Sequence, residues 1–139
     1  MKLITRDIDY AVRALCLMSG TKNGEIVSVA ELVKKLKTPR PFLRKILQLL
    51  NKNGVLKSYK GNGGGFKLAL PPQKIFLGNL VEIFQGPVQL NQCIFKKKIC
   101  PSISTCIFRQ KIGAIETYVV SQLKSISIDS LLAKEDFYG

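Results

Sequence analysis

The sequence predicts a mainly α-helical fold with one small β-hairpin, followed by a long helix that pairs with a second copy of the chain. Three observations predict this fold. Apolar residues recur at helical spacing in three segments before residue 54. A glycine-rich run at 61–65 separates two short segments of β-forming residues. A later apolar pattern runs for about 20 residues, which is more than a small domain can cover. The chain has 139 residues, 46% of them hydrophobic, which suffices for one small domain with an appendage.

The first helix is predicted to begin after Thr5, whose hydroxyl can accept a hydrogen bond from a backbone N–H group of the first turn. Gly20 is expected to end it. The apolar residues at helical spacing are Ile8, Ala11, Val12, Leu15 and Met18. Cys16 lies on the same helix, and we expect it to be a small buried side chain.

Two further short helices follow, with a tight connection between them. The second begins at Ser28, and Glu31 stands three residues later, which is the spacing of a capping box. The third is predicted to be capped by Thr38, with two prolines in its first turn. The residues expected to face the core are Val29, Leu32, Val33 and Leu36 on the second helix, and Phe42, Leu43, Ile46, Leu49 and Leu50 on the third. This pair of helices is a helix-turn-helix.

A β-hairpin is predicted next, with strands at 55–60 and 66–70 and a tip at 61–65. A glycine-rich tip also occurs in nucleotide-binding loops, but those loops lead from a strand into a helix rather than into a second strand. A helix-turn-helix followed by a hairpin is the winged-helix arrangement. The winged-helix domain is therefore expected to cover residues 1–75.

The rest of the chain divides into two parts. A connecting helix is predicted at 75–85, so residues 76–106 are expected to contain nearly all of this helix and a cysteine-bearing loop. Residues 107–139 are predicted to contain the long helix and a last short helix capped by Ser127. The stripe of the long helix is close to heptad spacing and comprises Phe108, Ile112, Ile115, Val119 and Ile126. The stripe either packs on the winged-helix core or meets the same stripe of a second subunit, and its length favours a two-fold dimer.

Positive charge is concentrated in the first part of the chain. The chain carries 22 Lys and Arg against 9 Asp and Glu, and residues 1–75 hold 15 of the basic and 4 of the acidic residues, a net charge of +11. A lysine-rich surface that only improves solubility would give the same excess of positive charge. The predicted winged helix favours the other explanation, binding to double-stranded DNA. The candidate DNA-binding residues are Arg40, Arg44, Lys45 and Gln48 on the third helix, Lys60, Asn62 and Gly63 at the wing tip, and Ser28 at a helix N-terminus.

Three of the four cysteines lie within 14 residues, as Cys93, Cys100 and Cys106. Lysines 96–98 lie between them and would lower the pKa of the thiols. A structural disulfide requires an oxidising compartment, and nothing in the sequence indicates export. A thiol switch needs only two cysteines and leaves the third without a role. Zinc would usually take histidine as the fourth ligand, whereas an iron–sulfur cluster accepts three thiolates and a different fourth ligand. The iron–sulfur cluster fits the residues best.

The composition also argues against several classes of protein. The chain contains no histidine, which excludes imidazole acid–base catalysis and Ser-His-Asp hydrolases, and we expect neither enzymatic activity nor a small-molecule substrate. No apolar run is long enough to span a bilayer, and the first residues lack the apolar core of a signal peptide. We therefore expect a cytoplasmic protein without a membrane partner.

The sequence resembles the iron–sulfur winged-helix transcription regulators of the IscR and NsrR type over essentially the whole chain. The segments that carry the resemblance are 9–15, 41–47, 53–56, the wing at 60–66, 77–78, 85–87 and the three cysteines. The resemblance implies a homodimeric regulator that binds a partly palindromic DNA operator under the control of an iron–sulfur cluster. It implies that the cluster senses nitric oxide, redox state or iron status. The alternative is a cluster-free winged-helix regulator controlled by a thiol switch or a partner protein.

The resemblance also indicates the ligands of the cluster. It implies that Cys93, Cys100 and Cys106 hold the iron. The IscR-like branch has a histidine shortly after the third cysteine, where this chain has Arg109, and arginine does not ligate iron. NsrR-like members use a carboxylate of the first helix, and Asp9 matches that position. We therefore expect Asp9 as the fourth ligand, and the other candidates are Asp7, Glu116, Cys16 or an exogenous small ligand. The alternative role for Asp9 is an ion pair with Arg13. By the same analogy a 4Fe–4S cluster is favoured over 2Fe–2S.

Overall fold

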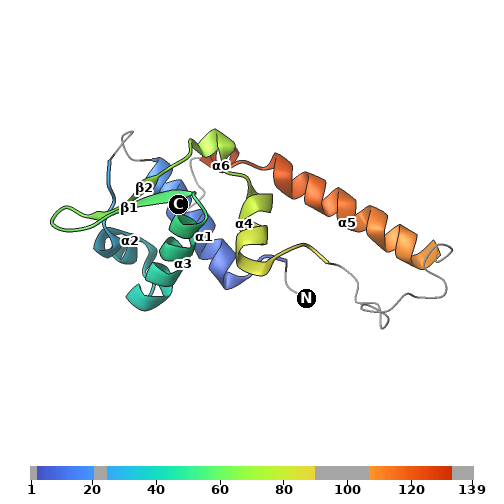
Figure 1. Cartoon of the computed structure of the whole chain (residues 1–139), viewed down its shortest axis with the longest axis horizontal. Coiled ribbons are helices and arrows are strands. Elements are labelled where there is room, and N and C mark those ends of the chain that lie inside the picture. The colour runs from blue at the N-terminus through green and yellow to red at the C-terminus, as the bar shows by residue number, and fades with distance from the viewer. Residues whose placement is uncertain (1–2, 21–24, 90–106, 133–139) are drawn as a thin grey trace.

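The computed structural model describes residues 3–20, 25–89 and 107–132. The structure is mainly helical with one antiparallel hairpin, as predicted (Figure 1). In chain order the elements are α1 (Arg6–Ser19), α2 (Val29–Leu36), α3 (Arg40–Lys52), β1 (Leu56–Tyr59), β2 (Gly65–Leu68), the 3₁₀ turn η1 (Pro72–Lys74), α4 (Leu77–Gln85), α5 (Ile107–Ser125) and α6 (Ile128–Leu132). All elements except most of α5 gather around one core.

Helix α1 forms the centre of this core, and α2, α3, α4, α6 and β2 pack against it. The helix is capped as predicted, because Thr5 Oγ1 accepts a hydrogen bond of 3.4 Å from the backbone N–H of Ile8. Ile8 and Leu15 are fully buried, as expected from their helical spacing. Cys16 is 4% exposed, which confirms that it is a buried side chain of the core.

The helix-turn-helix is present, with one correction at the start of α3. Ser28 caps α2 as predicted, since its Oγ accepts a 3.1 Å hydrogen bond from the N–H of Glu31. Thr38 does not cap α3, which begins after Pro39 without a side-chain cap. Thr38 is 4% exposed, and its hydroxyl has no hydrogen-bond partner among the described residues. The reason is that Pro39 itself takes the N-cap position, while the residue before a proline is restricted to extended backbone.

The core face of α3 also differs slightly from the prediction. Leu43, Ile46 and Leu50 are buried as expected. Leu47 is fully buried as well, whereas Phe42 and Leu49 are only half-buried at the edges of this face. The apolar face is therefore centred closer to Leu47 than the sequence pattern indicated.

The hairpin pairs Leu56 with Leu68 and Tyr59 with Gly65, which leaves residues 60–64 as the wing tip. The structure adds a backbone pairing that the sequence did not predict. Val27, just before α2, exchanges two hydrogen bonds of 2.8 and 2.9 Å with Phe66 of β2. The main chain comes so close here that a Cβ atom on Gly65 would overlap the carbonyl oxygen of Val27. The base of the wing is thereby attached to the start of the helix-turn-helix.

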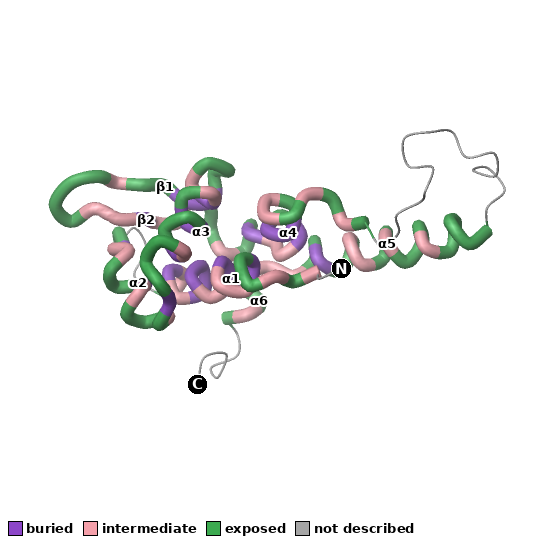
Figure 2. The backbone as a smooth tube through the Cα atoms, turned by 90° about the horizontal axis from the view of Figure 1, so that it is seen from below, coloured by how far each residue is buried: buried purple, intermediate pink, exposed green. Residues whose placement is uncertain are grey.

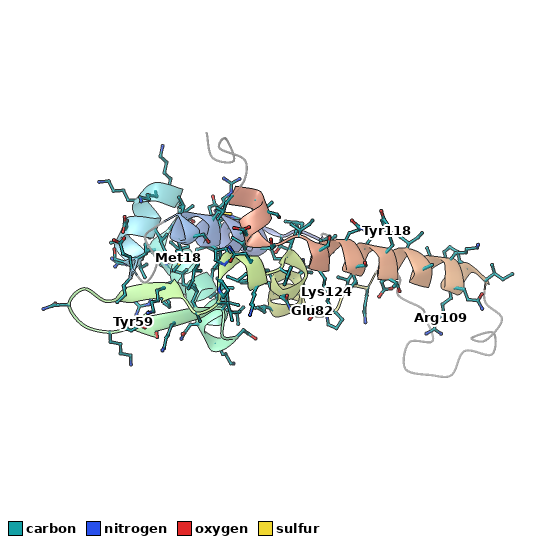
Figure 3. The ribbon with its side chains drawn as sticks, turned by 90° about the horizontal axis from the view of Figure 1, so that it is seen from above. Met18, Tyr59, Glu82, Arg109, Tyr118 and Lys124 are labelled. Atoms are coloured by element: carbon teal, nitrogen blue, oxygen red, sulfur yellow. The ribbon has the colours of Figure 1, made fainter. Side chains whose placement is uncertain are left out.

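Among the described residues, helix α5 contacts the rest of the molecule toward its C-terminal end. A 3.6 Å ion pair links Lys124 to Glu82 of α4, and Gly78 lets the α4 backbone approach Lys124 closely (Figure 3). After α5, the chain pairs Ser127 with Phe76 and returns α6 onto α1. Ser127 caps α6 as predicted, because its Oγ accepts a 3.1 Å hydrogen bond from the N–H of Ser130.

The remainder of α5 extends away from the body and is mostly exposed (Figures 1 and 2). Leu123 is the buried residue of this helix. The large apolar side chains exposed along the helix are Ile107 (68%), Phe108 (67%), Ile115 (51%) and Tyr118 (66%). Of the predicted stripe, Phe108 and Ile115 are exposed, Ile112 and Val119 are partly buried, and Ile126 lies just beyond the end of α5. In the described ranges, no helix combines the length and the apolar character needed to cross a membrane.

Candidate nucleic-acid interface

The exposed side of α3 carries all four predicted polar residues. Arg40, Arg44 and Gln48 succeed one another at intervals of four residues, and Lys45 lies beside this row. All four are exposed, while the opposite side of the helix is buried in the core. Among the described residues, none of the three cations has an ion-pair partner, so their charges are available to an external anion. The guanidinium groups can form paired hydrogen bonds with guanine and the amide with adenine.

The wing tip presents Lys60, Asn62 and Gly63, and all three are exposed. The tip turns tightly, with a 3.0 Å hydrogen bond from the N–H of Gly64 to the carbonyl of Gly61. Gly63 has a φ of 76°, which a residue with a side chain rarely adopts. The tip thus offers bare backbone beside a lysine, an arrangement suited to a phosphate or to the floor of a minor groove.

Ser28 lies at the N-terminus of α2 and is partly exposed. Its oxygen accepts the capping hydrogen bond from Glu31, so the hydroxyl hydrogen is left to donate to another group. The carboxylate of Glu31 lies 3.2 Å from the ammonium of Lys35. The geometry at Ser28 therefore suits a hydrogen bond to a phosphate oxygen.

Arg6 does not belong to the predicted set, yet it lies next to α3. Its guanidinium carbon is 4.9 Å from the ring centre of Phe42 and 5.7 Å from that of Tyr10. The two rings meet edge to face, with their centres 5.5 Å apart. The spacing of Arg6 and Tyr10, four residues on one helix, is the signal in the sequence that indicates a contact. The contact with Phe42 is a tertiary one, and the sequence pattern does not indicate it.

Asp9 forms the ion pair that the sequence offered as the alternative to iron ligation. Both of its carboxylate oxygens lie within hydrogen-bond distance of Arg13 Nε, at 3.2 and 3.3 Å. The Asp9 side chain is 49% exposed, so this pair contributes only a few tenths of a kcal/mol to stability. A weak, exposed pair leaves the carboxylate accessible, and ligation of iron by Asp9 stays a prediction.

The three candidate cluster ligands Cys93, Cys100 and Cys106 lie in 90–106, outside the described residues. The chain before this segment ends beside the start of α1, where Gln85 donates a hydrogen bond to the carbonyl of Leu3. A small cavity of about 130 Å³ lies between Leu3 and residues 85–89. In the described part of the chain, no group of three His, Cys, Asp or Glu side chains is arranged to hold a metal ion.

Comparison with known proteins identifies the family. The profile of the Rrf2 family, described as "Iron-dependent Transcriptional regulator", matches residues 4–134. A protein of Aquifex aeolicus described as a putative HTH-type transcriptional regulator is 31% identical, over 93% of this chain and 90% of its own length. The HTH-type transcriptional regulator NsrR of Bacillus subtilis is 25% identical, over 98% of this chain and 94% of its own length.

Two solved structures show the same fold. The structure of CymR, the global cysteine regulator of B. subtilis, has a TM-score of 0.77 and 19% identity, and the match covers 96% of this chain and 98% of CymR. The structure of T. potens IscR has a TM-score of 0.73 and 20% identity, and the match covers 100% of this chain and 93% of IscR. The exposed basic face of α3, the wing and these matches together lead to one conclusion. The chain belongs to the Rrf2 family of winged-helix, DNA-binding transcription regulators.

Proposed function

We propose that this protein is a homodimeric, cytoplasmic transcription regulator whose binding to a DNA operator is controlled by an iron–sulfur cluster. One observation carries the proposal. The segment that joins α4 of the winged-helix body to α5 contains three cysteines in a stretch of 14 residues. The family description as iron-dependent supports it, as does the similarity to NsrR. Because α5 is the proposed dimer helix, a change in this segment can alter how the two subunits are placed.

In the proposed complex, α3 enters the major groove and the wing contacts the neighbouring backbone or minor groove. Arg44 lies in the middle of the exposed row and is the candidate for a paired hydrogen bond to guanine. Lys60 and the wing tip supply contacts to phosphate, which position the protein without reading sequence. In a two-fold dimer, the two copies of α3 would contact two half-sites of a partly palindromic operator.

The donor set fits an iron–sulfur cluster in its chemistry. Cys93, Cys100 and Cys106 supply three thiolates, and Asp9 supplies an accessible carboxylate on α1. When bound, the cluster, favoured as 4Fe–4S, would supply an iron centre sensitive to nitric oxide, redox state or iron status. Lysines 96–98 would offset the negative charge of the thiolates. To serve as a ligand, Asp9 would have to give up its exposed ion pair with Arg13, which is a small cost.

Control of DNA binding requires a difference in free energy between two states of the dimer. The cysteine-bearing segment would bind its cofactor more tightly in one placement of the two α3 helices than in the other, and the coupling is reciprocal. A hundredfold change in operator affinity corresponds to about 2.7 kcal/mol of coupling.

Anaerobic purification and reconstitution test the cluster directly. We expect iron and sulfide in stoichiometric amounts and a visible chromophore, both of which are lost when Cys93, Cys100 or Cys106 is replaced by alanine. Asp9→Ala should still assemble a cluster but lose iron faster in the presence of a chelator. Glu31→Ala is the matched control, because Glu31 is also an acidic residue of a first helical turn and forms an exposed ion pair of 3.2 Å four residues along its helix, as Asp9 does. A protein that takes up neither iron nor sulfide contradicts the proposal, and iron loss from Asp9→Ala that is no faster than from Glu31→Ala removes Asp9 from the ligand set.

A thiol switch is the second candidate mechanism. The lysines between Cys93 and Cys100 favour it, because they would lower the pKa of nearby thiols and make them reactive. In that case DNA binding would respond to peroxide and be restored by dithiothreitol in a protein free of metal. The same anaerobic preparation, assayed before and after reconstitution, separates the two mechanisms.

A further inference from the structure

The geometry points to Arg6 as a second anchor on the DNA, a contact from α1 to a backbone phosphate at the edge of the groove that α3 enters. The inference rests on DNA binding by α3 and is independent of cluster control. Its basis is the contact of the Arg6 guanidinium with the rings of Phe42 and Tyr10, at 4.9 and 5.7 Å.

The two rings hold the Arg6 side chain without neutralising its charge. An aromatic ring attracts the guanidinium through its face but accepts none of its charge, so the N–H groups that point away from the rings can still donate to a phosphate. Arg6 is exposed and has no carboxylate partner among the described residues. Arg13, two turns further along α1, differs in this respect, because its charge is offset by Asp9 at 3.2 Å.

The position of Phe42 places Arg6 at one flank of the reading helix. At about 100° per residue, Phe42 lies roughly 60° around the helix from Lys45, on the side away from the row formed by Arg40, Arg44 and Gln48. A helix with its side chains is about as wide as the major groove. A cation held beyond its flank therefore meets the phosphates that border the groove and not the base edges.

The position is also fixed. Phe42 is half-buried as the third residue of α3, and both Phe42 and Tyr10 pack against the core. An arginine whose stem and head are already ordered loses little conformational freedom when it binds a phosphate. Arg6 would thus fix the orientation of the winged-helix body on the duplex and contribute no sequence preference of its own.

The experiment measures binding of the full-length protein to a mixed-sequence duplex of about 30 base pairs, by fluorescence anisotropy, between about 50 and 200 mM salt. Arg6→Gln should reduce the slope of log affinity against log salt by about 1.8 per dimer, because two phosphate contacts are lost. Its affinity should fall by the same factor for unrelated duplexes. Lys111→Gln is the matched control, since Lys111 is an exposed cation on α5, remote from α3, and its removal should leave the slope unchanged.

Two further variants separate contact from packing. Arg6→Lys keeps the charge and should retain most of the salt slope, whereas Phe42→Leu keeps an apolar side chain but removes the platform and should weaken binding. Melting temperatures identify any variant that is simply unstable. The inference is overturned if Arg6→Gln folds normally and keeps the wild-type slope. A wild-type protein without salt-dependent binding to DNA would instead contradict the proposed function itself.

Discussion

At the scale of single residues, the side chain that an arginine contacts determines whether its charge remains available to bind DNA. Arg13 is offset by Asp9, while Arg6 rests on aromatic rings and Arg44 is exposed on α3 without an ion-pair partner among the described residues. Of the basic residues on this surface, Arg44 combines a central place in the exposed row with a head group able to form paired hydrogen bonds. The wing lysine Lys60, in contrast, is a point charge on a turn.

These differences predict distinct effects for two alanine variants. Arg44→Ala should cost about 1–3 kcal/mol in operator binding and relax the preference at one base pair of each half-site. Lys60→Ala should weaken binding to all duplexes alike and reduce the salt slope by about one unit per protomer. Binding to a panel of operator variants at several salt concentrations checks both. An unchanged base preference in Arg44→Ala would assign the reading role to another residue.

Single residues also show where prediction from sequence works and where it stops. The caps at Thr5, Ser28 and Ser127 were predictable, because each depends on residues within three positions. The prediction that Thr38 caps α3 was wrong, because Pro39 occupies the N-cap position and Thr38 is buried. The platform under Arg6 depends on a contact between α1 and α3, which local spacing does not encode.

At the scale of elements, the wing is held in place by backbone pairing at its base. Val27 and Phe66 exchange hydrogen bonds of 2.8 and 2.9 Å, and this contact joins the hairpin to the segment that leads into α2. The hairpin itself was predictable from its glycine-rich tip. The first strand lies inside its predicted range, whereas β2 begins one residue earlier than predicted, because Gly65 pairs with Tyr59 and is not part of the tip. The pairing of Phe66 with Val27 was not predictable, because a single bridge between residues 39 positions apart leaves no periodic signal in the sequence.

This close approach predicts the effect of Gly65→Ala. The added Cβ would overlap the carbonyl oxygen of Val27, and the φ of 156° at this position already disfavours a side chain. The variant should lose about 1–3 kcal/mol of stability and detach the wing from the start of α2. Gly61→Ala is the control, because its Cβ would meet no atom within 4 Å and only the backbone preference is affected. Denaturant unfolding of the two variants compares them; a Gly65→Ala protein as stable as Gly61→Ala would show that the bridge is dispensable.

At the scale of the whole molecule, the described part of the chain forms a winged-helix body from which the helix α5 extends (Figure 1). The long helix was predicted from its apolar stripe, and the structure confirms it as α5, of 19 residues. The return of α6 onto α1 was not predicted, because it depends on packing between the two ends of the chain. The convergence of Cys93, Cys100 and Cys106 stays a prediction, since these residues lie outside the described ranges.

The exposed stripe of α5 predicts that the dimer depends on Ile115, which is 51% exposed in the single chain. Burial of an isoleucine stabilises by about 1.5–3 kcal/mol, and a two-fold interface contains two copies. Because about half of the Ile115 side chain is already covered in the single chain, its loss costs about 1.5–3 kcal/mol over the two copies, and the new ammonium group adds a desolvation cost. Ile115→Lys should therefore weaken the dimer by more than tenfold in dissociation constant. Thr117→Lys adds the same charge on the opposite side of the helix and should leave the dimer intact.

Sedimentation velocity at micromolar concentration distinguishes the two variants. A monomeric Ile115→Lys beside a dimeric Thr117→Lys assigns the stripe to the interface, and two dimeric variants would place the interface elsewhere. Because contact with two half-sites requires both subunits, the monomeric variant should also lose most of its affinity for a palindromic operator.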